Sequence, residues 1–350
     1  MRTRISMKFS NNYIFYPDNN ELVKAIDHFK RSLDDQTVIN DAADSSVTVQ
    51  DNFLHTRGNF EHHRYSTSVL NSAREKFEAM LVESRPEQSP LERAAIQNSL
   101  GNVLSALAQQ KMDADLYEQA IQAFRAALEA FTRDNSPLEW AATQYNLATA
   151  TQALGRQQGD SKLLKTSVDA YTDALLELSR ENSPREWAMT MFQLGATFHT
   201  HGKLLKGNRT FQKSVVAFKN ALTEFDADGD ALALSATHNS RGVVLHNLAE
   251  SEENAERLEE AIRAYDTALS VCMEQQLPFH LAVLCRVNRS TARAALAELT
   301  KDPAIAEEAA DDFELIIACF PHALQPLCLK HCEEQLEKSL AMVKTFSVAQ

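Results

Sequence analysis

The feature that most constrains the fold is a phrase that recurs every 47 residues. Ser89-Pro90, Ser136-Pro137 and Ser183-Pro184 open three similar stretches, and 136 − 89 and 183 − 136 both equal 47. Two further positions at this spacing hold Asp230-Ala231 and Leu277-Pro278. A fixed period of 20–50 residues is typical of stacked supersecondary units, none of which can bury its apolar face alone.

Each unit is predicted to contain two helices. The first opens with Ser-Pro-x-Glu, in which serine is a favoured N-cap, proline suits the first helical position and the glutamate completes a capping box. The second helix has an apolar face with i, i+3, i+7 spacing, as at Ile121, Phe124 and Leu128. The same face recurs in phase at Val168, Tyr171 and Leu175, at Val215, Phe218 and Leu222, at Ile262, Tyr265 and Leu269, and in a slipped copy at Ala310, Phe313 and Ile317.

Composition and charge agree with a folded helical protein. Apolar residues make up 44 % of the 350 residues, and glycine and proline occur nine times each, which favours helices over a large sheet. The net charge of −13 argues against nucleic-acid binding. The sequence has no apolar run of the roughly 20 residues that span a membrane, and its basic start lacks the apolar core of a signal peptide. Five cysteines, an odd number, fit a reducing compartment, so we expect a cytoplasmic protein with no nucleic-acid or membrane partner.

The segments NSLG (98–101) and YEQAIQAFRAAL (117–128) resemble a tetratricopeptide repeat. That family has a small residue in its first helix, here Gly101, Ala148, Gly195 and Gly242, and alanines around an aromatic residue in its second, here Ala120, Phe124 and Ala127. The period exceeds the family's usual 34 residues, so the chain looks like a long-repeat bacterial variant. The resemblance implies an all-α fold, a right-handed α-solenoid of stacked antiparallel helix pairs, and it specifies no activity.

Three regions are expected along the chain. Residues 1–17 form a non-repeat N-terminal segment that is rich in aromatic residues. Residues 18–320 form the array, with a degenerate part near 18–88 and units at 89–135, 136–182, 183–229, 230–276 and 277–320. Residues 321–350 supply a capping helix and tail, because the last apolar face of an array needs cover.

By analogy with the family's register, the first helices line a concave groove that binds a partner. Asparagine side chains there can bind a peptide backbone, and an aromatic side chain offers apolar contact. An arginine stripe suits an acidic or C-terminal group, although its members could instead pair with the acidic run at 306–314. The predicted groove residues are Asn98, Asn102, Tyr145, Asn146, Thr149, Phe192, His199, Asn239, His246, Arg286, Arg289 and Arg293.

These features predict a non-enzymatic scaffold or adaptor that binds a partner protein or peptide and needs no cofactor. The alternative is a ligand-gated regulator, in which a peptide or small anion in the groove controls a partner effector. A homo-oligomer is left open. The sequence lacks a phosphate-binding glycine loop, a G-x-S-x-G elbow and an H-E-x-x-H motif, so we expect no enzyme.

A cluster near the C-terminus has two interpretations. Cys319, His322, Cys328 and Cys332 are ligand types that zinc takes, and they lie within fourteen residues. Their spacing does not match the usual zinc fingers, and Cys328 and Cys332 are one turn apart on the expected terminal helix. The favoured interpretation is that these cysteines are small apolar residues of the core.

Overall fold

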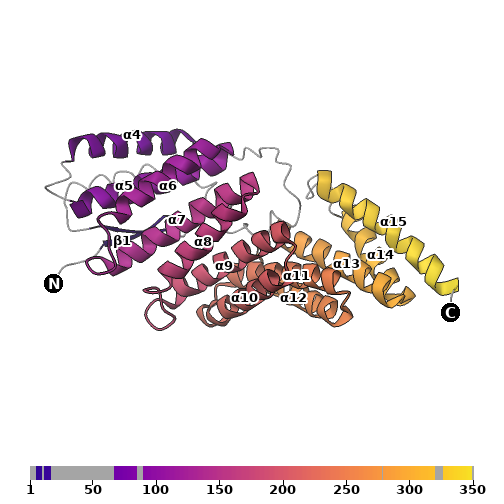
Figure 1. The fold of residues 1–350 in the computed structure, drawn as a ribbon. Helices are drawn as coiled ribbons and strands as arrows, with labels where there is room; N and C mark the ends of the chain where they lie inside the picture. The colour runs from indigo at the N-terminus through magenta and orange to yellow at the C-terminus, as the bar shows by residue number, and fades with distance from the viewer. Residues whose placement is uncertain are drawn as a thin grey trace. The chain divides into compact units, whose positions relative to one another are not determined.

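A computed structural model describes residues 5–9, 12–16, 67–84, 90–277, 279–319 and 326–348. They form a β-hairpin and the helices α4 to α15 (Figure 1). None of the described helices is long and apolar enough to cross a membrane.

The first helices of the units are equal in length. Each has 22 residues: α5 (Pro90–Lys111), α7 (Pro137–Gln158), α9 (Pro184–Leu205), α11 (Ala231–Glu252) and α13 (Phe279–Thr300). Their starts are separated by 47, 47, 47 and 48 residues (137 − 90, 184 − 137, 231 − 184, 279 − 231). The helix starts predicted at Pro90, Pro137 and Pro184 are therefore confirmed, and the fifth unit carries one extra residue before its first helix.

The second helices are α6 (Ala114–Leu128), α8 (Ser161–Ala174), α10 (Asn208–Asp228), α12 (Ala255–Glu274) and α14 (Pro303–Cys319). Acidic or amide side chains cap four of them. Asp113 Oδ1 accepts hydrogen bonds from Asp115 N (3.0 Å) and Leu116 N (3.3 Å). Asp160, Asn254 and Asp302 accept equivalent bonds in α8, α12 and α14. These caps satisfy N–H groups that have no partner within the helix.

The capping box predicted at Ser136 is wrong in one respect. Helix α7 begins where expected, but the Ser136 side chain makes no capping hydrogen bond. Its backbone has ψ 61°, whereas Asp113 and Asp160 have ψ 111° and 106°. Because an N-cap side chain reaches the first N–H groups from the extended region, the twisted backbone at Ser136 turns the hydroxyl away.

Small residues in the first helices let the second helices approach closely. A Cβ atom added to Gly101 would lie 2.5 Å from the ring of Phe124, and one added to Gly242 would lie 2.6 Å from Tyr265. These aromatic rings are fully buried, at 0 % and 1 % exposure. The recurring glycine and aromatic positions therefore form one contact that repeats in three helix pairs, at Gly101, Gly195 and Gly242.

The chain divides into two compact units, with the boundary between Gln193 and Leu194, inside α9. In the first, α4 (Thr67–Glu83), α5, α6, α7 and α8 pack in chain order. In the second, α10 to α15 also pack in chain order (Figure 1). This consecutive packing of helices makes an all-α solenoid, and that expectation is confirmed.

The last helix, α15 (Pro326–Val348), covers the end of the second unit. It packs on α13 and α14, and its side chains Cys328, Cys332 and Met342 are buried among residues of those helices. Most of its exposed residues are charged or polar, including Lys330, Glu333 and Glu337. This division between an apolar and a polar face is what an end cap of a repeat array requires.

The N-terminal segment 1–17 contains a hairpin. Strand β1 (Ile5–Phe9) pairs antiparallel with β2 (Asn12–Tyr16), with Met7 opposite Ile14. Strand β2 lies against α5 and α7, two consecutive first helices of the first unit. Of the degenerate part predicted near 18–88, residues 67–83 form α4, and residues 18–66 and 85–88 lie outside the described residues.

Candidate interaction surface

Polar side chains link neighbouring first helices. Asn146 Nδ2 of α7 donates to Asn98 Oδ1 of α5 over 3.0 Å. In the second unit, Asn288 Nδ2 of α13 donates to Asn239 Oδ1 of α11, also over 3.0 Å. The side chains of Asn247 and His199 lie 2.7 Å apart, between Nδ2 and Nε2. We call these three pairs the first-helix row.

The predicted groove residues are more buried than an open groove implies. Asn98 and Asn146 are 3 % and 1 % exposed, and His199 and Asn239 are both 0 % exposed. The buried members are Asn98, Asn102, Tyr145, Asn146, Phe192, His199, Asn239 and His246, and the half-buried ones are Thr149, Arg286, Arg289 and Arg293. Several of them therefore hold first helices together, and their contact with a partner stays a prediction.

One group of predicted groove residues also holds a second helix. The hydroxyl of Tyr171, in α8, donates to Gln152 Oε1 at 3.1 Å and lies 3.0 Å from Thr149 Oγ1. The ring of Tyr145 meets that of Tyr171 edge-on, with centroids 5.5 Å apart. Burial raises the pKa of Tyr171, so its hydroxyl stays protonated and available as a donor.

Two amide atoms of the first-helix row are buried without a hydrogen-bond partner among the described residues. They are Asn146 Oδ1, an acceptor, and Asn239 Nδ2, a donor. Each belongs to a side chain whose other amide atom is already bonded within the row. A buried polar atom without a partner costs about 1–3 kcal/mol, so both atoms favour an additional polar contact.

Two of the three arginines of the stripe, Arg289 and Arg293, pair with carboxylates of the second unit. Arg289 Nη1 lies 3.0 Å from Asp266 Oδ1, and Arg289 Nη2 lies 3.0 Å from Asp312 Oδ2. Arg293 Nη1 lies 2.9 Å from the same Asp312 oxygen, with Glu308 also nearby. For Arg289 and Arg293, the structure supports the pairing with the acidic run at 306–314. Arg286 makes no ion pair within the described part of the chain.

The extra residue of the fifth unit explains why the stripe misses the groove register. Asn146 lies 48 residues after its partner Asn98, whereas Asn288 lies 49 residues after Asn239. In the fifth unit, Ser290 therefore takes the place of Gly242, and it is buried at 0 % exposure. Arg286 and Arg293 consequently lie one residue away from the groove positions that the 47-residue register assigned to them. Their predicted place in the groove is corrected accordingly.

The histidines of the groove do not form a catalytic arrangement with each other. His199 bonds to Asn247, and its ring centroid lies 5.8 Å from that of Phe211. His246 Nε2 lies 3.4 Å from Glu250 Oε1, one turn along α11. This contact lowers the pKa of Glu250. The two histidines therefore contact different side chains of the second unit.

The cysteine cluster is divided between a helix end and a core. Cys328 and Cys332 are buried in α15, and Cys319 is exposed at the end of α14. A hydrogen bond with Cys328, and then burial, raises the pKa of Cys332. His322 lies outside the described residues, and His331 Nε2 lies 3.1 Å from Thr291 Oγ1. Within the part of the chain that the structure describes, no three His, Cys, Asp or Glu side chains are placed to hold a metal ion.

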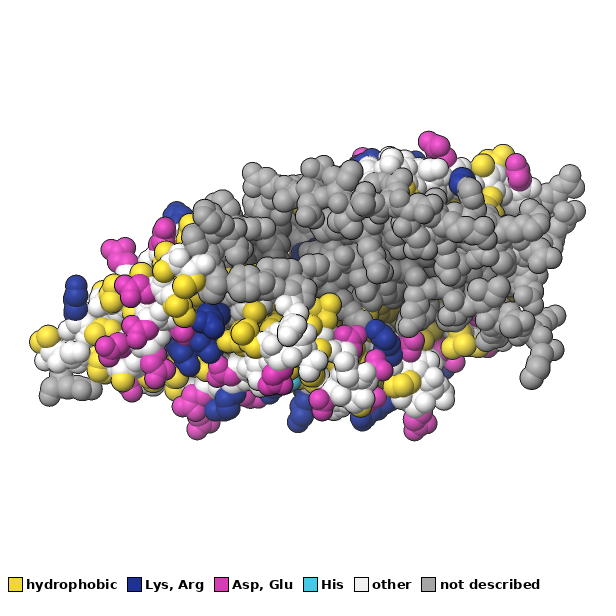
Figure 2. Space-filling view, turned by 180° about the vertical axis from the view of Figure 1, so that it is seen from behind, with side chains coloured by type: hydrophobic (Ala, Val, Ile, Leu, Met, Phe, Trp, Pro, Cys, Tyr) yellow, Lys and Arg dark blue, Asp and Glu magenta, His cyan; other side chains and the backbone are white. Residues whose placement is uncertain are grey.

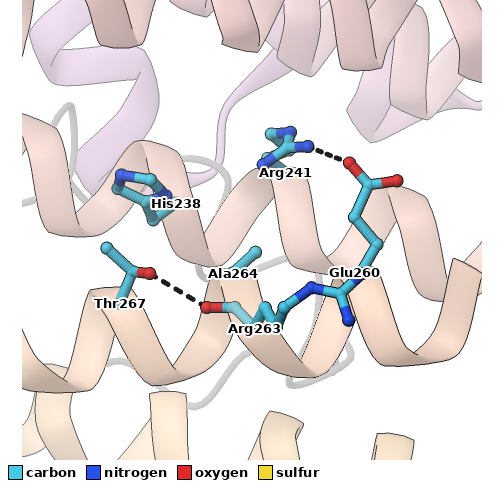
Figure 3. Close-up of a pocket in the computed structure, with 6 residues that line it drawn as sticks. All are labelled: His238, Arg241, Glu260, Arg263, Ala264 and Thr267. Atoms are coloured by element: carbon cyan, nitrogen blue, oxygen red, sulfur yellow. Dashed lines mark hydrogen bonds and ion pairs between the residues drawn. The ribbon is translucent and has the colours of Figure 1, made fainter.

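A depression between α11 and α12 was not predicted from the sequence. Its volume is about 330 Å³, and its walls are His238 and Arg241 of α11 and Glu260, Arg263, Ala264 and Thr267 of α12 (Figure 3). Arg241 Nη2 pairs with Glu260. Thr267 Oγ1 donates to the Arg263 carbonyl oxygen at 3.0 Å. The 47-residue register contains a signal for it, because Arg241 stands where Leu100, Leu147 and Leu194 stand in earlier units.

Two nitrogen atoms of the depression are buried without a hydrogen-bond partner in the described residues: His238 Nδ1 and Arg241 Nε. Burial lowers the pKa of His238 to about 4, and the positive charge of Arg241 contributes to this shift. The negative charge of Asp226 raises the pKa of His238 by a smaller amount. His238 is therefore neutral near pH 7. On the face shown in Figure 2, acidic and basic side chains are intermixed on the described surface.

Comparisons with known proteins identify no family for this chain. No family model matches the sequence, and no curated protein is similar to it. A solved structure, that of BtubC (BKLC) from P. vanneervenii, can be superimposed with a TM-score of 0.48 at 19 % sequence identity. The alignment covers 73 % of this chain and 94 % of that one. A likeness at this level carries no information on function.

Proposed function

We propose that the protein is a non-enzymatic, tetratricopeptide-like scaffold that binds an extended segment of a partner protein along its first helices. The fold supports this function because stacked helix pairs present repeated positions along one face, and such faces suit extended partners. The first-helix row places amide side chains at these positions in both units.

The observation that carries the proposal is the pair of unsatisfied amide atoms, Asn146 Oδ1 and Asn239 Nδ2. One accepts and the other donates, which is the pair of functions that a peptide backbone complements. Both atoms are buried in the free chain, so a partner segment reaches them only if neighbouring side chains move; bonds to it would then remove a cost of about 1–3 kcal/mol at each atom. Strand β2 provides an internal example of extended backbone against first helices, because it lies on α5 and α7.

The test uses the full chain to select binders from a library of displayed peptides, followed by measured dissociation constants. Two variants, Asn146→Leu and Asn239→Leu, keep the branched shape of the side chain and remove the amide. We expect at least one of them to weaken a selected peptide about tenfold or more, since a buried hydrogen bond is lost. Asn182→Leu, on an exposed turn, is the matched control and should leave affinity unchanged.

Circular dichroism of each variant separates loss of binding from loss of fold. A library that yields no binder to the folded chain would contradict the proposal. So would binders whose affinity is the same for the wild type and both row variants, because the contact would then lie elsewhere.

A further inference from the structure

The strongest departure from the repeat lies in the depression between α11 and α12. Leucine occupies one first-helix position in three consecutive units, and Leu100, Leu147 and Leu194 are 8 %, 8 % and 5 % exposed. The fourth unit has Arg241 at that position (194 + 47 = 241). A buried leucine site stabilises a stack through apolar contact, whereas an arginine there must keep its charge solvated or paired.

Arg241 is only partly satisfied. Its side chain is 20 % exposed, and its Nη2 pairs with Glu260, which is 38 % exposed. Its Nε is buried and has no partner among the described residues. An arginine has five N–H donors in a fixed fork, so pairing with one carboxylate leaves donors of Arg241 without an acceptor among the described residues.

A second guanidinium stands at the rim. Arg263, from α12, has a side chain that is 66 % exposed, and its contact with Glu259 is long, at 3.6 Å. Figure 3 shows the two arginines on facing helices, with Glu260 beside Arg241. An exposed pair of this kind contributes little, so Arg263 can turn to another anion at small cost.

The charge balance separates this depression from the arginine stripe. Arg289 and Arg293 face three carboxylates, those of Asp266, Glu308 and Asp312. The walls of the depression contain Arg241 and Arg263 but a single carboxylate, Glu260. With Glu259, which contacts Arg263, the two arginines of the depression face two carboxylates, one fewer than the two arginines of the stripe.

We propose that the depression between α11 and α12 binds an oxyanion group, carboxylate or phosphate, through the guanidinium groups of Arg241 and Arg263. The end of the Arg241 guanidinium that Glu260 leaves free donates to one side of the anion, and Arg263 closes over the other. The side chains of His238 and Thr267 lie at the wall and add neutral polar contacts. This site does not depend on partner binding by the first-helix row.

The experiment titrates the full chain with two probes, inorganic phosphate and citrate, at constant ionic strength set with chloride. Calorimetry gives the affinity, and the Nε–H resonance of Arg241 reports contact at the site itself. We expect at least one probe to bind and to shift that resonance. Binding of phosphate alone, or of citrate alone, identifies which oxyanion the site takes.

Three variants locate the site. Arg241→Leu restores the residue of the first three units, so the stack keeps its packing, and it should weaken binding about tenfold or more. Arg263→Gln should weaken it about threefold to tenfold. Arg257→Gln removes the same charge from the same helix outside the depression and should change affinity less than about twofold.

Two results would overturn the proposal. One is that neither probe shifts the Arg241 resonance of the wild-type chain, a readout that requires no variant to fold. The other is that Arg257→Gln weakens binding as much as Arg241→Leu, which would show attraction to general charge and not a site.

Discussion

At the scale of single residues, close contact between paired helices depends on a missing side chain. In Gly195→Ala, the new Cβ would lie 2.8 Å from the buried ring of Phe218. We expect the overlap to cost about 1–3 kcal/mol. Better helix propensity offsets about 1 kcal/mol of that, so unfolding in urea should show a net loss of about 1 kcal/mol. Adding Phe218→Leu should make the Gly195→Ala change less costly, and an unchanged penalty would mean that crowding is not its cause.

The buried imidazole of His238 predicts a dependence of stability on pH. Its pKa is about 4 in the folded chain, against 6.5 for an ordinary histidine. Between these values the unfolded chain binds more protons, so stability falls as the pH is lowered from 6.5 to 4. The difference between the two pKa values corresponds to a loss of at most about 3 kcal/mol in the free energy of unfolding. Because His238 is partly exposed, we expect a loss of about 1–2 kcal/mol. His238→Gln should flatten this part of the profile, and a profile identical to the wild type would contradict the assignment.

The five thiols differ in access. Cys319 is exposed, and Cys272, Cys285, Cys328 and Cys332 are buried. A disulfide reagent should therefore titrate one thiol per native chain rapidly and all five after denaturation. Cys319→Ser should abolish the fast phase. If the fast phase is missing from the wild type and appears after a chelator is added, Cys319 is held by a metal and the zinc interpretation is correct.

At the scale of elements, the sequence predicts helix starts well, because the residues that mark them lie next to each helix and recur in successive repeats. Ser-Pro placed the starts of α7 and α9 correctly, because proline is favoured at a first helical position whether or not serine caps it. The caps Asp113 and Asp160 also repeat at 47 residues, so the starts of α6 and α8 carry a local signal of the same kind.

Side-chain partners were harder to predict than helices. A register identifies positions on a helix face, but it does not say that Asn98 and Asn146 bond to each other or that Asp312 neutralises two arginines. Such pairs join elements far apart in sequence, and one inserted residue, as before α13, changes which side chains meet. The repeat alignment shows that Arg241 replaces a leucine, but it does not show the depression. The depression depends on how α11 packs on α12.

The two faces of α15 predict effects of very different size for the same substitution. Met342 is 7 % exposed and packs in the terminal core, whereas Leu340 is 45 % exposed. Met342→Glu should lower the stability of the second unit by about 2–4 kcal/mol, because it buries a charge without a partner. Leu340→Glu should change it by less than about 0.5 kcal/mol. Equal effects on thermal unfolding would show that α15 does not cap the array.

At the scale of the whole molecule, stability is expected to be additive along the chain. Within each unit, from α4 to α8 and from α10 to α15, the helices pack mainly on their neighbours in sequence, as α11 does on α10 and α12. In an array of this kind, stability is approximately a sum of repeat and neighbour terms. The effect of a local defect should therefore fade with distance along the sequence.

A reciprocal pair of variants tests this property. Gly242→Ala crowds Tyr265 in the second unit, and Gly101→Ala crowds Phe124 in the first. Hydrogen exchange read by mass spectrometry should speed up in α11 and α12 for Gly242→Ala, with α5 and α6 unchanged. Gly101→Ala should give the opposite pattern, because opening is local in such arrays. If both variants raise exchange equally from α4 to α15, the chain opens as one cooperative body, and the neighbour-sum description of its stability is wrong.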